Sequence, residues 1–165
     1  MRLVLGLAVA GLVAAVLTAG AGPSRAADSS LPVPRFVSLR SDEVNVRTGP
    51  GVRYPIDWVF QRKTMPVQVL AEVETWRKIR AIDGTEGWVH QSMLTGRRTA
   101  IVLGEVRTLR RKNDPEAAAV ALVEPGVIGT LLECKTAWCR LEVAGQKGWL
   151  PRDQVWGVLP SETFN

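Results

Sequence analysis

Histidine and cysteine are scarce in this chain of 165 residues: His90 is the only histidine, and Cys134 and Cys139 are the only cysteines. General acid–base and nucleophilic catalysis need a positioned base, and no partner constellation surrounds His90 in the sequence. A zinc site needs four ligands, which these three residues do not supply. The composition therefore predicts a non-catalytic protein without catalytic residues, metal or cofactor.

Long apolar runs are missing after the N-terminus. Arg2 is followed by an unbroken run of Leu, Val, Ala and Gly over residues 3–17, which is shorter than the about 20 residues of a membrane span. Small side chains at Ser24 and Ala26 fit a signal-peptide cleavage site. Residues 1–26 are predicted to be a signal peptide cleaved at Ala26, which leaves no membrane span; an uncleaved anchor is the alternative.

A strong excess of one charge is missing as well. The chain has 21 Lys and Arg against 16 Asp and Glu, a formal net charge of +5. No nucleic-acid stripe is visible, so nucleic acid is excluded as a partner. The basic runs Arg97-Arg98 and Arg110-Arg111-Lys112 are interpreted as solvated loops, with contact to anionic wall polymer or lipid headgroups as the alternative.

The two cysteines predict a disulfide. An exported chain reaches compartments where disulfides persist. Residues 131–141 fit a strand, a tight loop and a second strand, and the four residues between Cys134 and Cys139 bring the cysteines face to face at the neck of a hairpin. A redox pair prefers two intervening residues. We therefore expect a structural disulfide between Cys134 and Cys139.

The remaining chain has the composition of a small all-β protein. Residues 27–36 are polar and proline-broken, which favours an extended leader. Short strand-like apolar stretches follow, separated by many of the 15 glycines and ten prolines, with no sustained helical periodicity. The segment Ala117–Val123 lies between Pro115 and Pro125 and fits either a helix or a strand.

An internal repeat divides this part of the chain in two. The segment Trp76–Val89 aligns with Trp138–Leu150: each has a tryptophan, a strand, a turn centred on glycine, and a Gly-Trp pair. The distance from Arg47 to Trp76 is 29 residues and that from Arg110 to Trp138 is 28. A period of about 62 residues is one small domain rather than a solenoid unit.

These residues carry a resemblance to a known family. The stretch Val44–Gly51, together with Trp76 and Gly87-Trp88-Val89, resembles the bacterial SH3 domain; the second copy matches at Trp138 and Gly148-Trp149 but has Arg111–Asp114 in place of the early glycines. The resemblance implies an all-β fold of two tandem SH3-like barrels after the predicted signal peptide. The stretch between Gly96 and Gly104 is short and partly apolar, so we expect the two barrels to be packed together. The resemblance and the signal peptide together also imply the periplasm, with secretion as the alternative.

The expected divisions are 1–26 signal peptide, 27–36 leader, 37–98 first barrel, 99–158 divergent second barrel and 159–165 C-terminal tail. The residues expected to be structural are Gly49, Pro50, Gly51, Gly87, Trp88, Gly148 and Trp149.

The loop after Gly51 is the candidate binding site. It occupies the place of the specificity loop of SH3-type barrels and holds aromatic residues beside one charge of each sign, which suits a peptide or sugar-peptide. Packing of these aromatics onto the barrel is the alternative interpretation. For Arg47 a salt bridge to Glu43 or Glu72 is favoured over ligand contact, and Trp138, inside the predicted disulfide loop, is interpreted as structural. The candidate ligand-binding residues are Tyr54, Trp58, Trp76, Arg47, Arg53 and Asp57.

Two functions fit this sequence. The first is an exported binding module that recognises cell-wall peptide, peptidoglycan or an extended peptide through the aromatic residues of the first barrel. The second is a structural or adaptor protein that docks on another envelope protein through a barrel edge strand or a basic face, without a small ligand.

Overall fold

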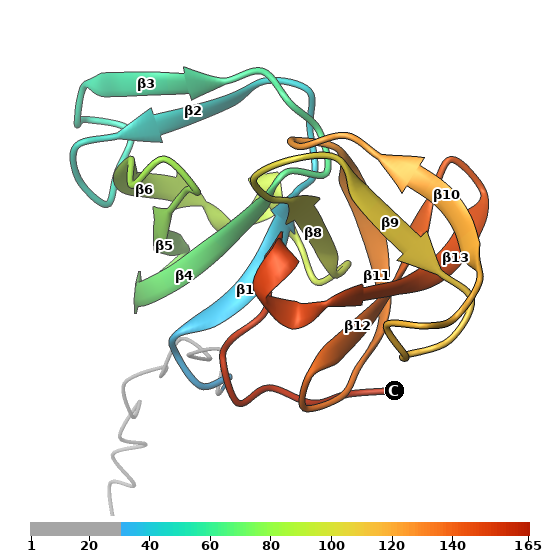
Figure 1. Cartoon of the computed structure of the whole chain (residues 1–165). Helices are drawn as coiled ribbons and strands as arrows, with labels where there is room; N and C mark the ends of the chain where they lie inside the picture. Colours follow the sequence, from blue (N-terminus) through green and yellow to red (C-terminus); the bar gives the residue numbers. More distant parts are fainter. Residues whose placement is uncertain (1–30) are drawn as a thin grey trace, which may run out of the picture.

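The strands of the first copy form one seven-stranded antiparallel sheet. The structure, a computed structural model, describes residues 31–165, so the predicted signal peptide and the start of the predicted leader lie outside the described residues. The strand order is β3-β2-β6-β5-β4-β1-β7, and Figure 1 labels β1 to β6 of this sheet. The strands are β1 (Arg35–Leu39), β2 (Val44–Arg47), β3 (Ile56–Phe60), β4 (Pro66–Val73), β5 (Trp76–Arg80), β6 (Glu86–His90) and β7 (Leu94–Thr95).

The second copy repeats this sheet strand for strand, in the order β10-β9-β13-β12-β11-β8-β14. Its strands are β8 (Thr99–Val102), β9 (Arg107–Arg110), β10 (Ala119–Val123), β11 (Ile128–Cys134), β12 (Trp138–Val143), β13 (Gln146–Pro151) and β14 (Val155–Trp156). A 3-10 turn precedes the last strand of each sheet: η1 (Gln91–Met93) and η2 (Arg152–Gln154). The prediction of an all-β chain with two tandem SH3-like barrels is confirmed, and the ambiguous segment before Pro125 supplies a strand, β10.

The two sheets also share their irregularities. The pairing of β4 with β5 shifts register between Val69 and Ala71, and the pairing of β11 with β12 shifts between Leu131 and Glu133. A bulge increases the local twist of a strand. Bulges at matching positions therefore curl both sheets in the same way, and they make residues at matching positions comparable one by one.

Glycine lets two strands cross closely in each barrel. A Cβ at Gly87 would lie 2.3 Å from Val46 Cγ1, and a Cβ at Gly148 would lie 2.6 Å from Leu109 Cγ. The partners Val46 and Leu109 are core residues of β2 and β9. Any side chain at either glycine would push β6 from β2 or β13 from β9.

The two barrels are packed against each other through buried contacts, as the short and partly apolar stretch between them predicted. Ser38 Oγ and Thr99 Oγ1 lie 2.6 Å apart and are both buried. Phe36 meets Trp156 edge to face at 4.9 Å between ring centroids, and Ile101 of the second sheet belongs to the core of the first barrel. Close packing of this kind favours one rigid arrangement over two freely moving domains.

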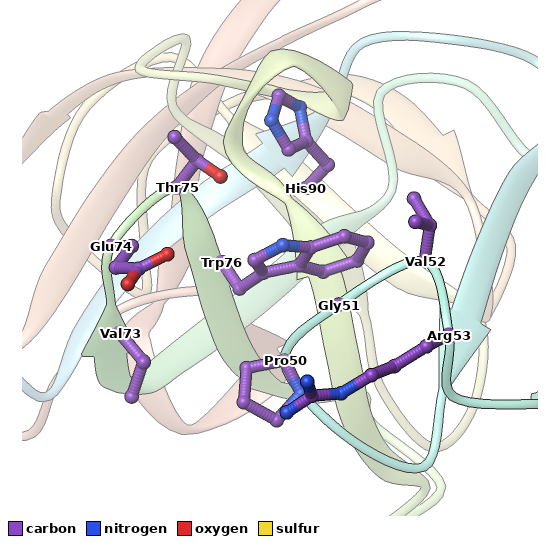
Figure 2. A pocket seen from close by; sticks show the side chains of 9 residues that line it. All are labelled: Pro50, Gly51, Val52, Arg53, Val73, Glu74, Thr75, Trp76 and His90. Atoms are coloured by element: carbon purple, nitrogen blue, oxygen red, sulfur yellow. The ribbon is translucent and has the colours of Figure 1, made fainter.

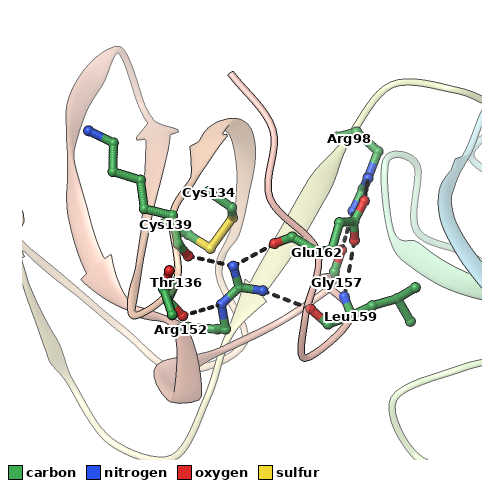
Figure 3. Close-up of a disulfide and its surroundings, with 9 residues drawn as sticks. Arg98, Cys134, Thr136, Cys139, Arg152, Gly157, Leu159 and Glu162 are labelled. Carbon is green, nitrogen blue, oxygen red and sulfur yellow. Dashed lines mark hydrogen bonds and ion pairs between the residues drawn. A yellow bond between two sulfur atoms is a disulfide. The ribbon is translucent and has the colours of Figure 1, made fainter.

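The predicted disulfide is confirmed. Cys134 and Cys139 face each other at the end of the β11–β12 hairpin, with their Cα atoms 4.1 Å apart (Figure 3). Both side chains are buried. The bond therefore ties β11 to β12 inside the second core.

The C-terminal tail is bound to the second barrel rather than extended into solvent. Phe164 pairs with Cys134 through two backbone hydrogen bonds of 2.9 and 3.1 Å. Arg98 binds the Glu162 carboxylate, and Arg152 donates to the carbonyls of Thr136, Leu159 and Glu162 (Figure 3). The interpretation of Arg98 as part of a solvated loop is wrong, because its charge is used to hold the tail.

Candidate functional site

A hollow beside Trp76 is the candidate site in the first barrel. Trp76 is the first residue of β5 and directly follows the turn at Glu74 and Thr75. Across the β5–β6 hairpin it pairs with His90, the last residue of β6. The indole and imidazole rings meet edge to face, with centroids 5.5 Å apart. The half-buried indole borders both a hollow of about 600 Å³ and a smaller one of about 270 Å³. The larger hollow is lined by Pro50, Gly51, Val52, Arg53, Val73, Glu74, Thr75, Trp76 and His90 (Figure 2).

Arg47 fixes the loop that forms one wall of this hollow. Its Nη1 donates to the carbonyl of Tyr54 at 2.7 Å and to that of Val52 at 3.2 Å. The favoured salt bridge of Arg47 with Glu43 or Glu72 is not what the structure shows. Arg47 satisfies backbone carbonyls of the loop, and its side chain also borders the smaller hollow.

Tyr54 holds the same loop from the inside. A Cβ at Gly49 would lie 2.4 Å from Cδ1 of the Tyr54 ring, so the ring lies directly against the glycine backbone. Tyr54 does not line either hollow beside Trp76. Its contacts correspond to the packing alternative considered for this loop, and they place Val52 and Arg53 at the rim of the larger hollow.

The structure brings together only some of the residues predicted for the site. Trp76 and Arg53 line the larger hollow, and Arg47 lines the smaller one. Trp58 and Asp57 lie on β3, outside both sets of lining residues. The register shift in the pairing of β2 with β3 falls next to Asp57, and the Trp58 side chain remains 52% exposed.

Two important members of the site, His90 and Glu74, were not predicted from the sequence. Hairpin counting would have found His90: a turn at Gly84 that pairs Arg80 with Glu86 must pair Trp76 with His90. Glu74 stands in the two-residue turn before Trp76, with a positive φ of 50°. No sequence pattern directs its carboxylate toward the loop.

The site carries one charge of each sign. Arg53 contributes a guanidinium from the loop and Glu74 a carboxylate from the hairpin turn (Figure 2). The hydrogen bond from Arg53 to the Tyr54 hydroxyl, 3.3 Å long, raises the pKa of Arg53 above its ordinary value. The guanidinium is positively charged at neutral pH with or without this bond. A ligand that bears both an ammonium and a carboxylate matches this arrangement.

The His90 ring serves first as a cap. Its Nδ1 lies 2.7 Å from Ser92 Oγ and accepts the Ser92 backbone N–H at 3.3 Å, at the start of η1. This fixes the ring against Trp76. Among residues 31–165 no group of three or more His, Cys, Asp or Glu is placed to hold a metal ion. Within the same range no helix is long and apolar enough to cross a membrane.

Comparison with known proteins identifies both barrels. The description "Bacterial SH3 domain" matches residues 40–96 and 105–157, which together are more than half of the chain. No curated protein matches the chain.

Several solved structures are similar to part of this chain. They include NlpC2 from Trichomonas vaginalis (13% identity, TM-score 0.36, covering 77% of this chain and 49% of that one). NlpC1 from the same organism has 14% identity and a TM-score of 0.35, covering 79% and 48%. An NlpC/P60 family protein from Bacillus cereus has 13% identity and a TM-score of 0.33, covering 73% and 55%. The chain thus spans about half the length of these structures.

Proposed function

The chain belongs to the bacterial SH3 domain family, and from this premise we propose that it is an exported, non-catalytic binding protein that holds cell-wall peptide in the larger hollow beside Trp76, in its first barrel. The observation that carries the proposal is the hollow itself. It is open, bordered by an indole and the apolar side chains of Pro50 and Val52, and it has charged groups on two walls. Concave sites with an aromatic floor and few polar groups are typical of ligand-binding sites.

The charges favour a wall stem peptide over a purely apolar ligand. Stem peptides carry free carboxylates and, at a diamino acid, an amine. Arg53 and Glu74 offer one opposite charge for each. The indole of Trp76 supplies contact area at a small cost in side-chain entropy.

The periplasm is the proposed location, with secretion as the alternative. The disulfide between Cys134 and Cys139 is of the kind that persists in oxidising compartments outside the cytoplasm. The wall ligand is accessible from such a compartment.

The test is co-sedimentation of the exported protein with purified peptidoglycan sacculi at low and moderate salt. We expect pelleting to survive moderate salt and Trp76→Ala to weaken binding at least about tenfold, as for a central aromatic contact. Trp58→Ala is the matched control, because it removes an exposed tryptophan outside the hollow. Equal retention of the Trp76→Ala variant and the unaltered protein, with both folded, would contradict the proposal.

The adaptor function has one specific observation in its favour. β3 is the terminal strand of the first sheet, and it exposes both Ile56 and Trp58. Exposed apolar side chains on an edge strand are suited to docking by another protein. Cross-linking in the envelope tests this: loss of a cross-linked partner on Trp58→Ala but not on Trp76→Ala would favour the adaptor.

A further inference from the structure

The second barrel has a groove at the position of the smaller Trp76 hollow. It has a volume of about 290 Å³ and is lined by Val106, Arg107, Thr108, Arg110, Pro115, Trp138, Pro151 and Gln154. Strand register makes the two sites comparable: Trp138 pairs with Pro151 as Trp76 pairs with His90. The same indole therefore stands at the same place in both barrels.

The loop of the second barrel is fixed as in the first. Arg110 Nη1 donates to the carbonyl of Ala117 at 2.8 Å, seven residues further on, as Arg47 does to Tyr54. This places Pro115 beside Trp138, where Val52 stands beside Trp76. The groove is thus built from an indole held near two prolines, Pro115 and Pro151, which are rigid walls that lose little entropy on binding.

The charges of the two grooves differ. The smaller Trp76 hollow contains Glu43 and Arg47, whereas the Trp138 groove contains Arg107 and Arg110 and has Val106 at the position of Glu43. Within the described part of the chain, Arg107 donates to the Leu103 carbonyl and to Glu105, and Arg110 to a single carbonyl. Each guanidinium has five N–H groups, and these bonds use two of them on Arg107 and one on Arg110. Glu105 is highly exposed, and such an ion pair is weak.

We propose that the Trp138 groove is a second ligand site, selective for a peptide segment rich in carboxylates, so that the protein engages wall peptide through both barrels. This rests on the proposed function of the first barrel. It replaces the structural role that the sequence suggested for Trp138. The charge complementarity of two arginines without a lining carboxylate determines the ligand class.

The experiment is an NMR titration of the exported, labelled protein with muramyl tetrapeptide released from sacculi. The indole N–H signals of Trp76 and Trp138 are assigned through Trp76→Phe and Trp138→Phe. We expect both signals to shift in a saturable manner. Tetrapeptide amidated at its carboxylates is expected to move the Trp138 signal at a several-fold higher concentration.

A pair of variants at Val106 tests the charge argument without touching either arginine. The Val106 side chain is 53% exposed, so glutamate or lysine fits there without burial. Val106→Glu gives the Trp138 groove a carboxylate at the position that Glu43 has in the smaller Trp76 hollow. It should weaken binding at Trp138 roughly threefold to tenfold. Val106→Lys adds a positive charge beside Arg107 and Arg110, and it should bind the tetrapeptide more tightly than Val106→Glu.

The outcomes separate this inference from the proposed function. A shift at Trp76 without a shift at Trp138 overturns the second site and leaves the function of the first barrel standing. Equal binding by Val106→Glu and Val106→Lys overturns the selectivity for carboxylates. Absence of a shift at both indoles overturns both proposals.

Discussion

The two barrels tie the same hairpin in chemically different ways. In the second barrel, Cys134 and Cys139 form a disulfide across β11 and β12. The register-matched pair across β4 and β5 is Glu72 and Arg77, which form an ion pair of 2.9 Å. One fold therefore accepts either a covalent or an ionic link at this position, provided that the link is buried.

The difference extends to the neighbouring arginine of each barrel. Arg35 lies next to β4 as Arg98 lies next to β11, since Arg35 pairs with Val69 and Arg98 bonds Leu131. Arg35 uses Glu72 as its partner. In the second barrel a cysteine occupies that position, and Arg98 instead binds Glu162 of the tail. Because the disulfide takes the position of the Glu72 carboxylate, the arginine of the second barrel is bound by a carboxylate of the tail instead.

The largest effect is expected from Glu72→Ala. The Arg77 side chain is only 6% exposed and that of Glu72 13%. Removing one partner of a buried ion pair leaves the other charge buried without its counter-charge. The first barrel should therefore lose about 3 kcal/mol of unfolding free energy. Residue-resolved hydrogen exchange measures this for each barrel separately.

The control for Glu72→Ala is Glu86→Ala, which removes a carboxylate that binds Lys78 and Arg80 on the surface. Exposed ion pairs contribute little. Similar exchange rates for the Glu72→Ala and Glu86→Ala variants would show that the ionic link is not the equivalent of the disulfide.

Removal of the disulfide by Cys134→Ala with Cys139→Ala should have the next largest effect. The short loop limits the loss of unfolded-state entropy, so we expect a cost of about 2 kcal/mol, confined to the second barrel and its tail. Hydrogen exchange at the amide of Phe164, which bonds Cys134, is the readout. Faster exchange throughout the first barrel as well would mean that the barrels unfold as one unit.

The loops differ in a second matched pair of residues. Gly49 and Tyr54 of the first barrel correspond to Lys112 and Ala117 of the second, at the same distances from Arg47 and Arg110. The Tyr54 ring leaves no room for a Cβ at position 49, so that position must be glycine. Ala117 has no ring, so the second loop does not need a glycine at position 112. We therefore expect Gly49→Ala to displace the ring and cost about 1–2 kcal/mol.

The double variant Gly49→Lys with Tyr54→Ala copies the second loop and should recover most of that stability. Denaturant unfolding followed by hydrogen exchange distinguishes the two variants. If the double variant is less stable than Gly49→Ala alone, the two residues are not a matched pair.

Local patterns predicted the fold well and the site only in part. The repeat, the Gly-Trp pairs and the cysteine spacing are short-range signals, and from them the two barrels and the disulfide follow. Trp76 and Arg53 were expected at the site because they flank recognisable turns, and both line the larger hollow. Trp58 was expected in the binding region because it is close in sequence, but β3 carries it away from Trp76.

Long-range pairs explain most of what the sequence did not reveal. Arg98 and Glu162 are 64 residues apart, and no local pattern relates them. Glu72 likewise binds Arg35, which is 37 residues away. Such partners are set by the packing of whole strands, so an arginine that is solvated by every local criterion can hold a tail in place.

The smallest effect sharpens the comparison through pH. Burial alone would raise the pKa of Glu162, but hydrogen bonds from Arg98 and the Leu159 amide outweigh it and hold that pKa below the ordinary 4.5. A lowered folded-state pKa means that the carboxylate stabilises the fold above pH 4.5. This contribution is lost as the pH falls through the lowered value.

Glu162→Gln should therefore cost less than about 1 kcal/mol at neutral pH, because the group is partly exposed to solvent. The same substitution should flatten the acid-side decline in stability of the second barrel while leaving that of the first unchanged. Residue-resolved exchange between pH 3 and 6 is the measurement, with Glu86→Gln as the control that alters only the first barrel. An unchanged acid profile of the second barrel in the Glu162→Gln variant would show that Arg152 and the Phe164 pairing hold the tail without the Glu162 carboxylate. The ion pair of Arg98 with Glu162 would then not be a stabilising counterpart of the ion pair of Arg35 with Glu72.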